Sequence, residues 1–64
     1  MNNKISETIL AFLYQELGLK RSSIDLGIKL SIINKTSLPI SLWSNGLINS
    51  EELDKFYEFL YKNN

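Results

Sequence analysis

The chain has 64 residues, seven basic and seven acidic side chains, no net charge and 44% hydrophobic residues. This length accommodates one small domain, and the composition is too apolar for a disordered chain. Because Cys and His are absent, disulfides, thiol or histidine catalysis and the usual structural zinc sites are excluded. We expect one domain over residues 1–64 that has no enzymatic activity, cofactor or metal.

The apolar residues form no segment that suits a secretory signal or a membrane span. Residues 1–8, MNNKISET, lack an apolar core, and the longest apolar run ends at Tyr14, too short for a bilayer. A cytoplasmic location without membrane insertion is therefore expected. Ile and Leu together number 19, which is plentiful for so short a chain. We expect part of this surface to be buried against a protein partner or a second copy.

Apolar residues recur at helical spacing and predict an all-α, compact four-helix domain built from two helix-turn-helix hairpins. The helices are expected at residues 4–17, 22–33, 38–45 and 50–61. Asn3 is a suitable N-cap for the first helix, and Gly18 is a suitable left-handed stop. Ser22 with Asp25 resembles a weak capping box for the second helix, with Lys20 as the alternative last non-helical residue.

The second helix is apolar over much of its circumference. Two edges carry aliphatic side chains: Ile24, Ile28 and Ile32 on one, Leu26, Leu30 and Ile33 on the other. Such a helix is either central in its domain or faces a partner. Gly27, in its interior, is expected to let a neighbouring helix approach closely.

The third and fourth helices have the clearest boundary signals. Ser37 is a suitable N-cap for the third helix, Pro39 suits its first turn, and Gly46 suits its end. Asn49 and Glu52 predict a capping box at the start of the fourth helix. The inner face of the fourth helix is expected to carry Leu53, Phe56, Tyr57 and Leu60.

A shift of 29 residues lays the first predicted hairpin on the second, so that Tyr14 meets Trp43. This indicates an internal duplication, although any two amphipathic hairpins of equal length would align similarly. The pattern LxxxGLIxxEELxxFxxFL, around Gly46 to Leu60, resembles the N-terminal domain of type II secretion and pilus-assembly ATPases. That resemblance implies a helical scaffold that binds a cyclic dinucleotide. Each family motif opens with Arg, whereas Ser37 and Thr8 stand at the corresponding positions here, so a degenerate nucleotide-binding domain is an alternative function.

A second resemblance covers nearly the whole chain. It rests on FLYQELGL, SIDLGIKL, LPISLW and GLINSEELDKFYEFL, which begin at residues 12, 23, 38 and 46. In these segments the chain is similar to a family of small cyanobacterial proteins of unknown function. The resemblance implies a compact helical fold and a cyanobacterial origin, and it implies no activity.

Residues 16–30, ELGLKRSSIDLGIKL, also resemble a helix-turn-helix DNA reader. Two features argue against this function. Tyr14 stands where that motif needs a small residue, and the second helix offers Asp25, Gly27 and Ile28 to a DNA groove in place of the Arg, Lys, Asn or Gln that read bases. The zero net charge also argues against nucleic-acid binding. DNA binding is therefore retained only as a further alternative.

The remaining candidates form no catalytic set. The acids Glu51, Glu52 and Asp54 are explained by the dipole at the start of a helix. Aromatic residues are enriched at the centres of protein interfaces, which makes them candidate partner-binding residues. The candidates are the aromatic Tyr14, Trp43 and Tyr61, together with the polar Asn45. Helical spacing favours a core position over a partner-binding position for Tyr14 and Tyr57. For Trp43 and Tyr61 it favours neither position over the other. The sequence thus predicts a non-enzymatic protein-interaction or regulatory docking module, with no small-molecule ligand.

Overall fold

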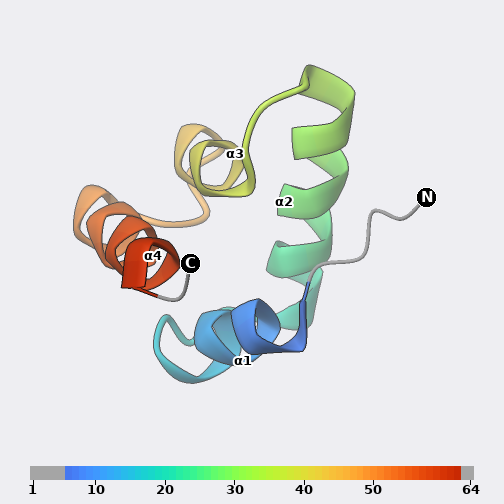
Figure 1. The fold of residues 1–64 in the computed structure, drawn as a ribbon. Coiled ribbons are helices and arrows are strands. Elements are labelled where there is room, and N and C mark those ends of the chain that lie inside the picture. The colour runs from blue at the N-terminus through green and yellow to red at the C-terminus, as the bar shows by residue number, and fades with distance from the viewer. Residues whose placement is uncertain (1–5, 63–64) are drawn as a thin grey trace.

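The computed structural model describes residues 6–62, which form four α-helices (Figure 1). The helices are α1 (Glu7–Gln15), α2 (Arg21–Asn34), α3 (Leu38–Ser44) and α4 (Ser50–Lys62). No strand occurs within these described residues. The predicted all-α four-helix domain is confirmed.

The boundaries of α1 differ from the predicted 4–17. Ser6 has an extended backbone, and its Oγ accepts a hydrogen bond from the Ile9 N–H at 3.2 Å, so the helix begins at Glu7. The predicted cap Asn3 lies outside the described residues. The helix ends at Gln15, and Gly18 follows with a φ of +64°, the left-handed conformation expected of it.

Helix α2 is slightly longer than the predicted 22–33. It begins after Lys20, the alternative boundary, and no side chain caps its first turn. Lys35 ends the helix in the left-handed conformation, with a φ of +56°. The Thr36 N–H donates to the Ser31 carbonyl oxygen at 3.0 Å, a bond that closes the helix end without a glycine.

The signals for α3 and α4 are confirmed. The Ser37 Oγ accepts from the Ile40 N–H at 3.4 Å, and Pro39 lies in the first turn of α3. At α4, the Glu52 N–H donates to the Asn49 Oδ1 at 2.8 Å. The Asn49 N–H donates in return to the Glu52 Oε1 at 2.9 Å. These two bonds form the predicted capping box.

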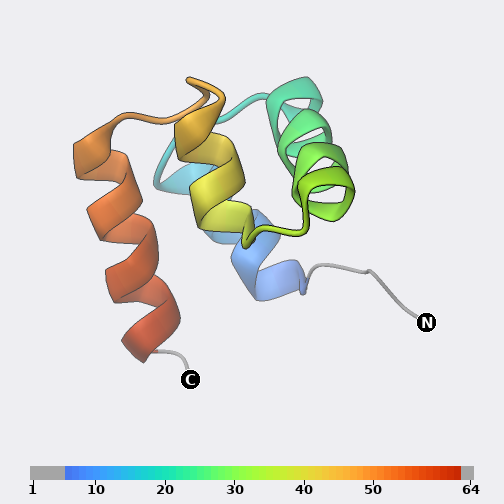
Figure 2. The same cartoon turned by 90° about the horizontal axis from the view of Figure 1, so that it is seen from above.

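Helix α3 lies between α2 and α4, with α1 beneath this row (Figure 2). The close approach of α2 and α3 occurs at Gly27, as predicted. The Ser41 Oγ is buried and donates to the Gly27 carbonyl oxygen at 2.7 Å. A side-chain methyl at Gly27 would contact Leu42 Cδ2 and lie 3.1 Å from Leu42 Cγ. The absence of a Cβ therefore sets the distance between these helices.

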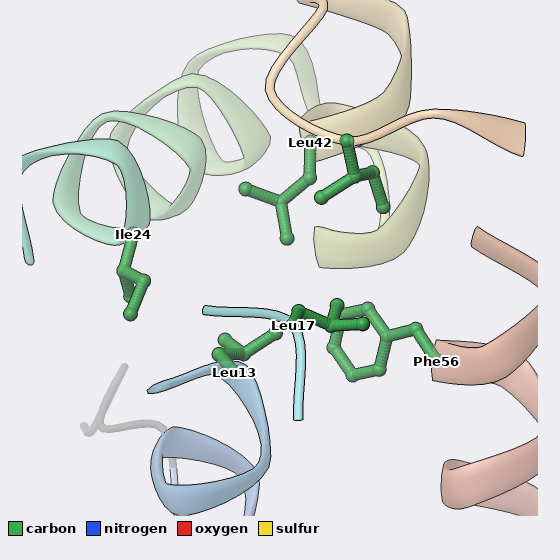
Figure 3. Close-up of a cluster of buried hydrophobic side chains, with 6 residues drawn as sticks. Leu13, Leu17, Ile24, Leu42 and Phe56 are labelled. Atoms are coloured by element: carbon green, nitrogen blue, oxygen red, sulfur yellow. The ribbon is translucent and has the colours of Figure 1, made fainter. Parts of the chain in front are cut away.

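The core draws on all four helices and two of their connections (Figure 3). It consists of Leu13, Leu17, Ile24, Leu42, Ile48 and Phe56. Phe12 joins α1 to α4, because its ring stacks on Phe59 at 4.2 Å and on Phe56 at 5.7 Å between centroids. The predicted inner-face position of Tyr57 is wrong. Tyr57 is exposed, and Phe59 packs against the core in its place.

Candidate docking surface

The four predicted partner-binding residues lie on three different helices or their ends. Tyr14 belongs to α1, Trp43 and Asn45 to the end of α3, and Tyr61 to the last turn of α4. Among the described residues, no hydrogen bond or ring stack joins any two of these four side chains. Each of these four side chains is therefore described by its own surroundings in the fold.

Tyr14 is exposed, so its favoured core position is wrong. Its hydroxyl accepts a hydrogen bond from the Arg21 Nη1 at 3.3 Å, and the Arg21 Nε lies 3.0 Å from the Asp25 Oδ1. The hydrogen bond to Tyr14, followed by the contact with Asp25, raises the pKa of Arg21 above its ordinary value. The ring is thus tied to the start of α2, where it helps to fix the turn between α1 and α2.

Asn45 has a local structural contact. Its Nδ2 donates to the Ser41 carbonyl oxygen at 2.8 Å and satisfies one of the last acceptors of α3. Trp43, on the preceding turn, is 44% exposed, although its neighbour Leu42 is fully buried. The indole takes part in no hydrogen bond or ring stack found within residues 6–62. Trp43 therefore remains a candidate contact residue, whereas Asn45 has an explanation within the fold.

Tyr61 is the most exposed of the large apolar side chains in the described chain, at 86%. It borders an open hollow of about 600 Å³ between the start of α1 and the end of α4. The hollow is lined by Ser6, Thr8, Ile9, Tyr57, Phe59, Leu60 and Tyr61. Tyr57 and Tyr61 are one helical turn apart, so their rings share one side of α4.

A second apolar surface lies on α2, and it was not among the predicted site residues. We define the α2 outer face as Leu26, Lys29, Ile32 and Ile33. Leu26 and Ile33 are two turns apart on one side of the helix, and Lys29 lies between them and Ile32. Leu26, Ile32 and Ile33 are 44%, 51% and 60% exposed. They face away from the side on which Ile24 and Gly27 are buried.

The surroundings of the α2 outer face are basic. Lys20, Arg21, Lys29 and Lys35 all lie on or beside α2, whereas Asp25 is the one acid within the helix. Asp25 is already paired with Arg21. The charge on and beside α2 is therefore positive on balance, and Lys29 lies among the exposed aliphatic side chains, one turn from Asp25.

The sequence contained a signal for this surface. The apolar circumference of α2 predicted a helix that is either central or faces a partner. The structure places α3 in the central position and α2 at the edge of the row (Figure 2). Periodicity alone could not distinguish the two positions, because it gives the width of an apolar surface and not its neighbours.

Two kinds of functional element are absent from residues 6–62. No cluster of three or more acidic, His or Cys side chains in this part of the chain could hold a metal ion. Nor does any helix there have both the length and the apolarity to cross a bilayer.

The chain matches a family model built from known proteins. The family model described as "Protein of unknown function (DUF2949)" matches residues 6–61. No curated protein and no solved structure matches the chain. The matched range covers all four helices except the last residue of α4. The chain therefore belongs to the DUF2949 family of proteins of unknown function.

Proposed function

We propose that the chain is a small protein-docking domain that binds its partner through the α2 outer face. The observation that carries this proposal is that α2 is apolar on two sides and packs into the domain with only one. A single exposed aliphatic residue would need no explanation. Three of them within two turns of one edge helix form a surface that a partner can cover.

The size of this surface indicates modest affinity. Complete burial of a Leu or Ile side chain contributes roughly 1.5–3 kcal/mol relative to full exposure. Because each of the three is about half exposed, covering them would contribute on the order of 3 kcal/mol in total. This gain must also offset the lost freedom of two molecules, so polar and charged contacts have to add to it. Lys29 and Lys35 are placed to make such contacts with acidic groups.

Site-specific photocrosslinking tests the proposal in the cells from which the protein comes. A photoreactive phenylalanine analogue replaces Ile33, the most exposed aliphatic residue of the surface, and in a second strain it replaces Ser44. Ser44 is the control because it is exposed and helical and belongs to α3, outside the α2 outer face. We expect discrete crosslinked species from position 33 and none of the same mass from position 44.

The crosslinked species must also depend on the apolar surface. Adding Leu26→Glu to the protein labelled at position 33 should reduce the adduct at least tenfold while the circular dichroism spectrum stays helical. No adduct at position 33, or the same adducts from position 44, would contradict a docking role for this face. Trp43 and Tyr61 remain candidate contacts, and labels at these positions can be compared in the same experiment.

A further inference from the structure

We propose that the occupant of the α2 outer face is α4 of a second copy of this chain. The inference deepens the proposed docking function and rests on it. We define the α4 outer edge as Asp54, Tyr57, Glu58 and Tyr61, all of which are exposed. Tyr57 and Tyr61 provide an apolar strip one turn long, and Asp54 and Glu58 provide carboxylates beside it. The Glu58 Oε2 lies 3.8 Å from the Lys62 Nζ, so Asp54 is the carboxylate of this edge without an ion pair in the described chain.

The two surfaces have opposite charge. On and beside α2, Lys20, Arg21, Lys29 and Lys35 stand against Asp25, four basic groups to one acidic group. On α4, Glu51, Glu52, Asp54 and Glu58 stand against Lys55 and Lys62, four acidic groups to two basic groups. Complementary potentials favour the encounter of such surfaces and set their register.

The same charges disfavour pairing of like surfaces. A symmetric dimer through two α2 outer faces would bring Lys29 close to Lys29 or Lys35 of the second copy. A symmetric dimer through two α4 outer edges would bring Asp54 and Glu58 close to carboxylates. Like charges opposed across an interface cost free energy. The mixed contact, α2 on α4, avoids both penalties.

The positions of the two helices determine the kind of assembly. Helices α2 and α4 lie on opposite sides of α3 (Figure 2). A contact between α2 of one copy and α4 of the next is therefore head to tail and leaves one unused surface at each end. Such an interface produces chains of copies, or a ring if the rotation between copies closes.

Sedimentation velocity of the full chain tests self-association directly. Between 10 µM and 1 mM protein at low salt, we expect the average mass to rise beyond that of a dimer. The apparent affinity should fall at least threefold when about 0.5 M NaCl screens the charges. A chain that remains monomeric at 1 mM and low salt would overturn the inference.

Two variants that block opposite surfaces test the head-to-tail arrangement. Ile33→Glu places a negative charge in the α2 outer face, and Tyr61→Lys places a positive charge in the apolar strip of the α4 outer edge, where it would face the cations of α2. Each variant alone should be monomeric. An equimolar mixture should form a one-to-one dimer, because the intact α4 of the first fits the intact α2 of the second. Both positions are exposed, and circular dichroism should confirm that both variants fold.

Other results of the mixing experiment would contradict the inference. If Tyr61→Lys alone associates like the unmodified chain, the interface is a symmetric one through α2. If the mixture remains monomeric, α4 is not the occupant. Should either variant fail to fold, Lys29→Glu and Asp54→Lys replace the two variants and block the same two surfaces by charge reversal. These variants must associate only when they are mixed.

The photocrosslinking experiment tests the docking function separately from the identity of its partner. An adduct at position 33 with a different protein, from a chain that is monomeric in sedimentation, would retain the docking function and exclude the second copy as its occupant. An adduct with twice the mass of the chain supports both.

Discussion

At the scale of single residues, Gly27 has the greatest influence on the geometry of the domain. Its missing side chain lets α3 approach α2, and its carbonyl oxygen accepts the hydrogen bond from the buried Ser41 hydroxyl. Glycine in a helix interior costs roughly 1 kcal/mol relative to alanine. The close helix contact and the buried hydrogen bond offset that cost.

Replacing Gly27 by Ala should therefore destabilise the domain although alanine is the better helix former. The new methyl group would collide with Leu42, which is fully buried and has little room to move. Overpacking typically costs about 1–3 kcal/mol, so a net loss on the order of 1 kcal/mol is expected after the gain in helix propensity. Urea denaturation followed by circular dichroism measures this difference.

Ser22→Ala serves as the control, because Ser22 is an exposed residue of the same helix. It should change the free energy of unfolding by no more than about 0.5 kcal/mol. A higher urea midpoint for Gly27→Ala than for the unmodified chain would show that the helices can separate without loss.

At the scale of helices, the boundaries that the sequence predicted best are those with a side-chain cap. Ser37 begins α3, and Asn49 with Glu52 begins α4, each through a hydrogen bond within three residues of the chain. Local bonds of this kind can be recognised from spacing alone. Helix α2 begins without a side-chain cap, and its predicted start was correspondingly less definite.

The spacing of apolar residues does not predict which side of a helix packs against which neighbouring helix. Tyr57 and Phe59 both lie near apolar residues along α4, yet only Phe59 packs against the core. The choice depends on α1, whose Phe12 stacks on Phe59. The same limitation kept the α2 outer face from being identified, because its exposure depends on the central position of α3.

Helix α1 should be the least firmly held element once its aromatic contact is removed. Phe12→Ala would delete both ring stacks to α4 and leave Leu13 as the buried residue of α1. Because Phe12 is half buried, we expect a loss of about 2 kcal/mol, below the 3–5 kcal/mol typical of a fully buried Phe. Hydrogen exchange should show α1 amides losing protection before those of α2 and α3.

Gln15→Ala is the matched control, because Gln15 is an exposed residue of the same helix. Its exchange pattern should match that of the unmodified chain. Equal loss of protection in all four helices of Phe12→Ala would contradict independent opening of α1 and indicate a single cooperative unit.

At the scale of the whole molecule, the charge distribution favours the proposed docking function over its alternatives. The net charge is zero, and the guanidinium of Arg21 is already bonded to Tyr14 and Asp25. A DNA reader would need several cations free to contact phosphates. The balanced but uneven distribution, basic around α2 and acidic around α4, suits contact between proteins better.

If the chain were a nucleotide-binding domain, cyclic dinucleotides would release or absorb measurable heat on binding. We expect no heat of binding at millimolar ligand. The two positions that open the motifs in the secretion ATPases hold Thr8 and Ser37, which lack the guanidinium that clamps phosphate or guanine. Ser37 also uses its hydroxyl to cap α3. Isothermal titration calorimetry of the unmodified chain tests this expectation, and saturable heat would contradict it.

A double variant, Thr8→Arg with Ser37→Arg, separates two reasons for an absence of binding. If the scaffold is shared and only the clamp is missing, the restored guanidinium groups should produce saturable heat with the dinucleotide. If the scaffold itself differs, the variant should remain silent although it folds. Because Ser37 caps α3, Ser37→Ala must be measured beside it; this variant should lose about 1 kcal/mol of stability and show no heat. Binding by the double variant alone would indicate that the scaffold can accept the dinucleotide and that only the clamping guanidinium groups are missing.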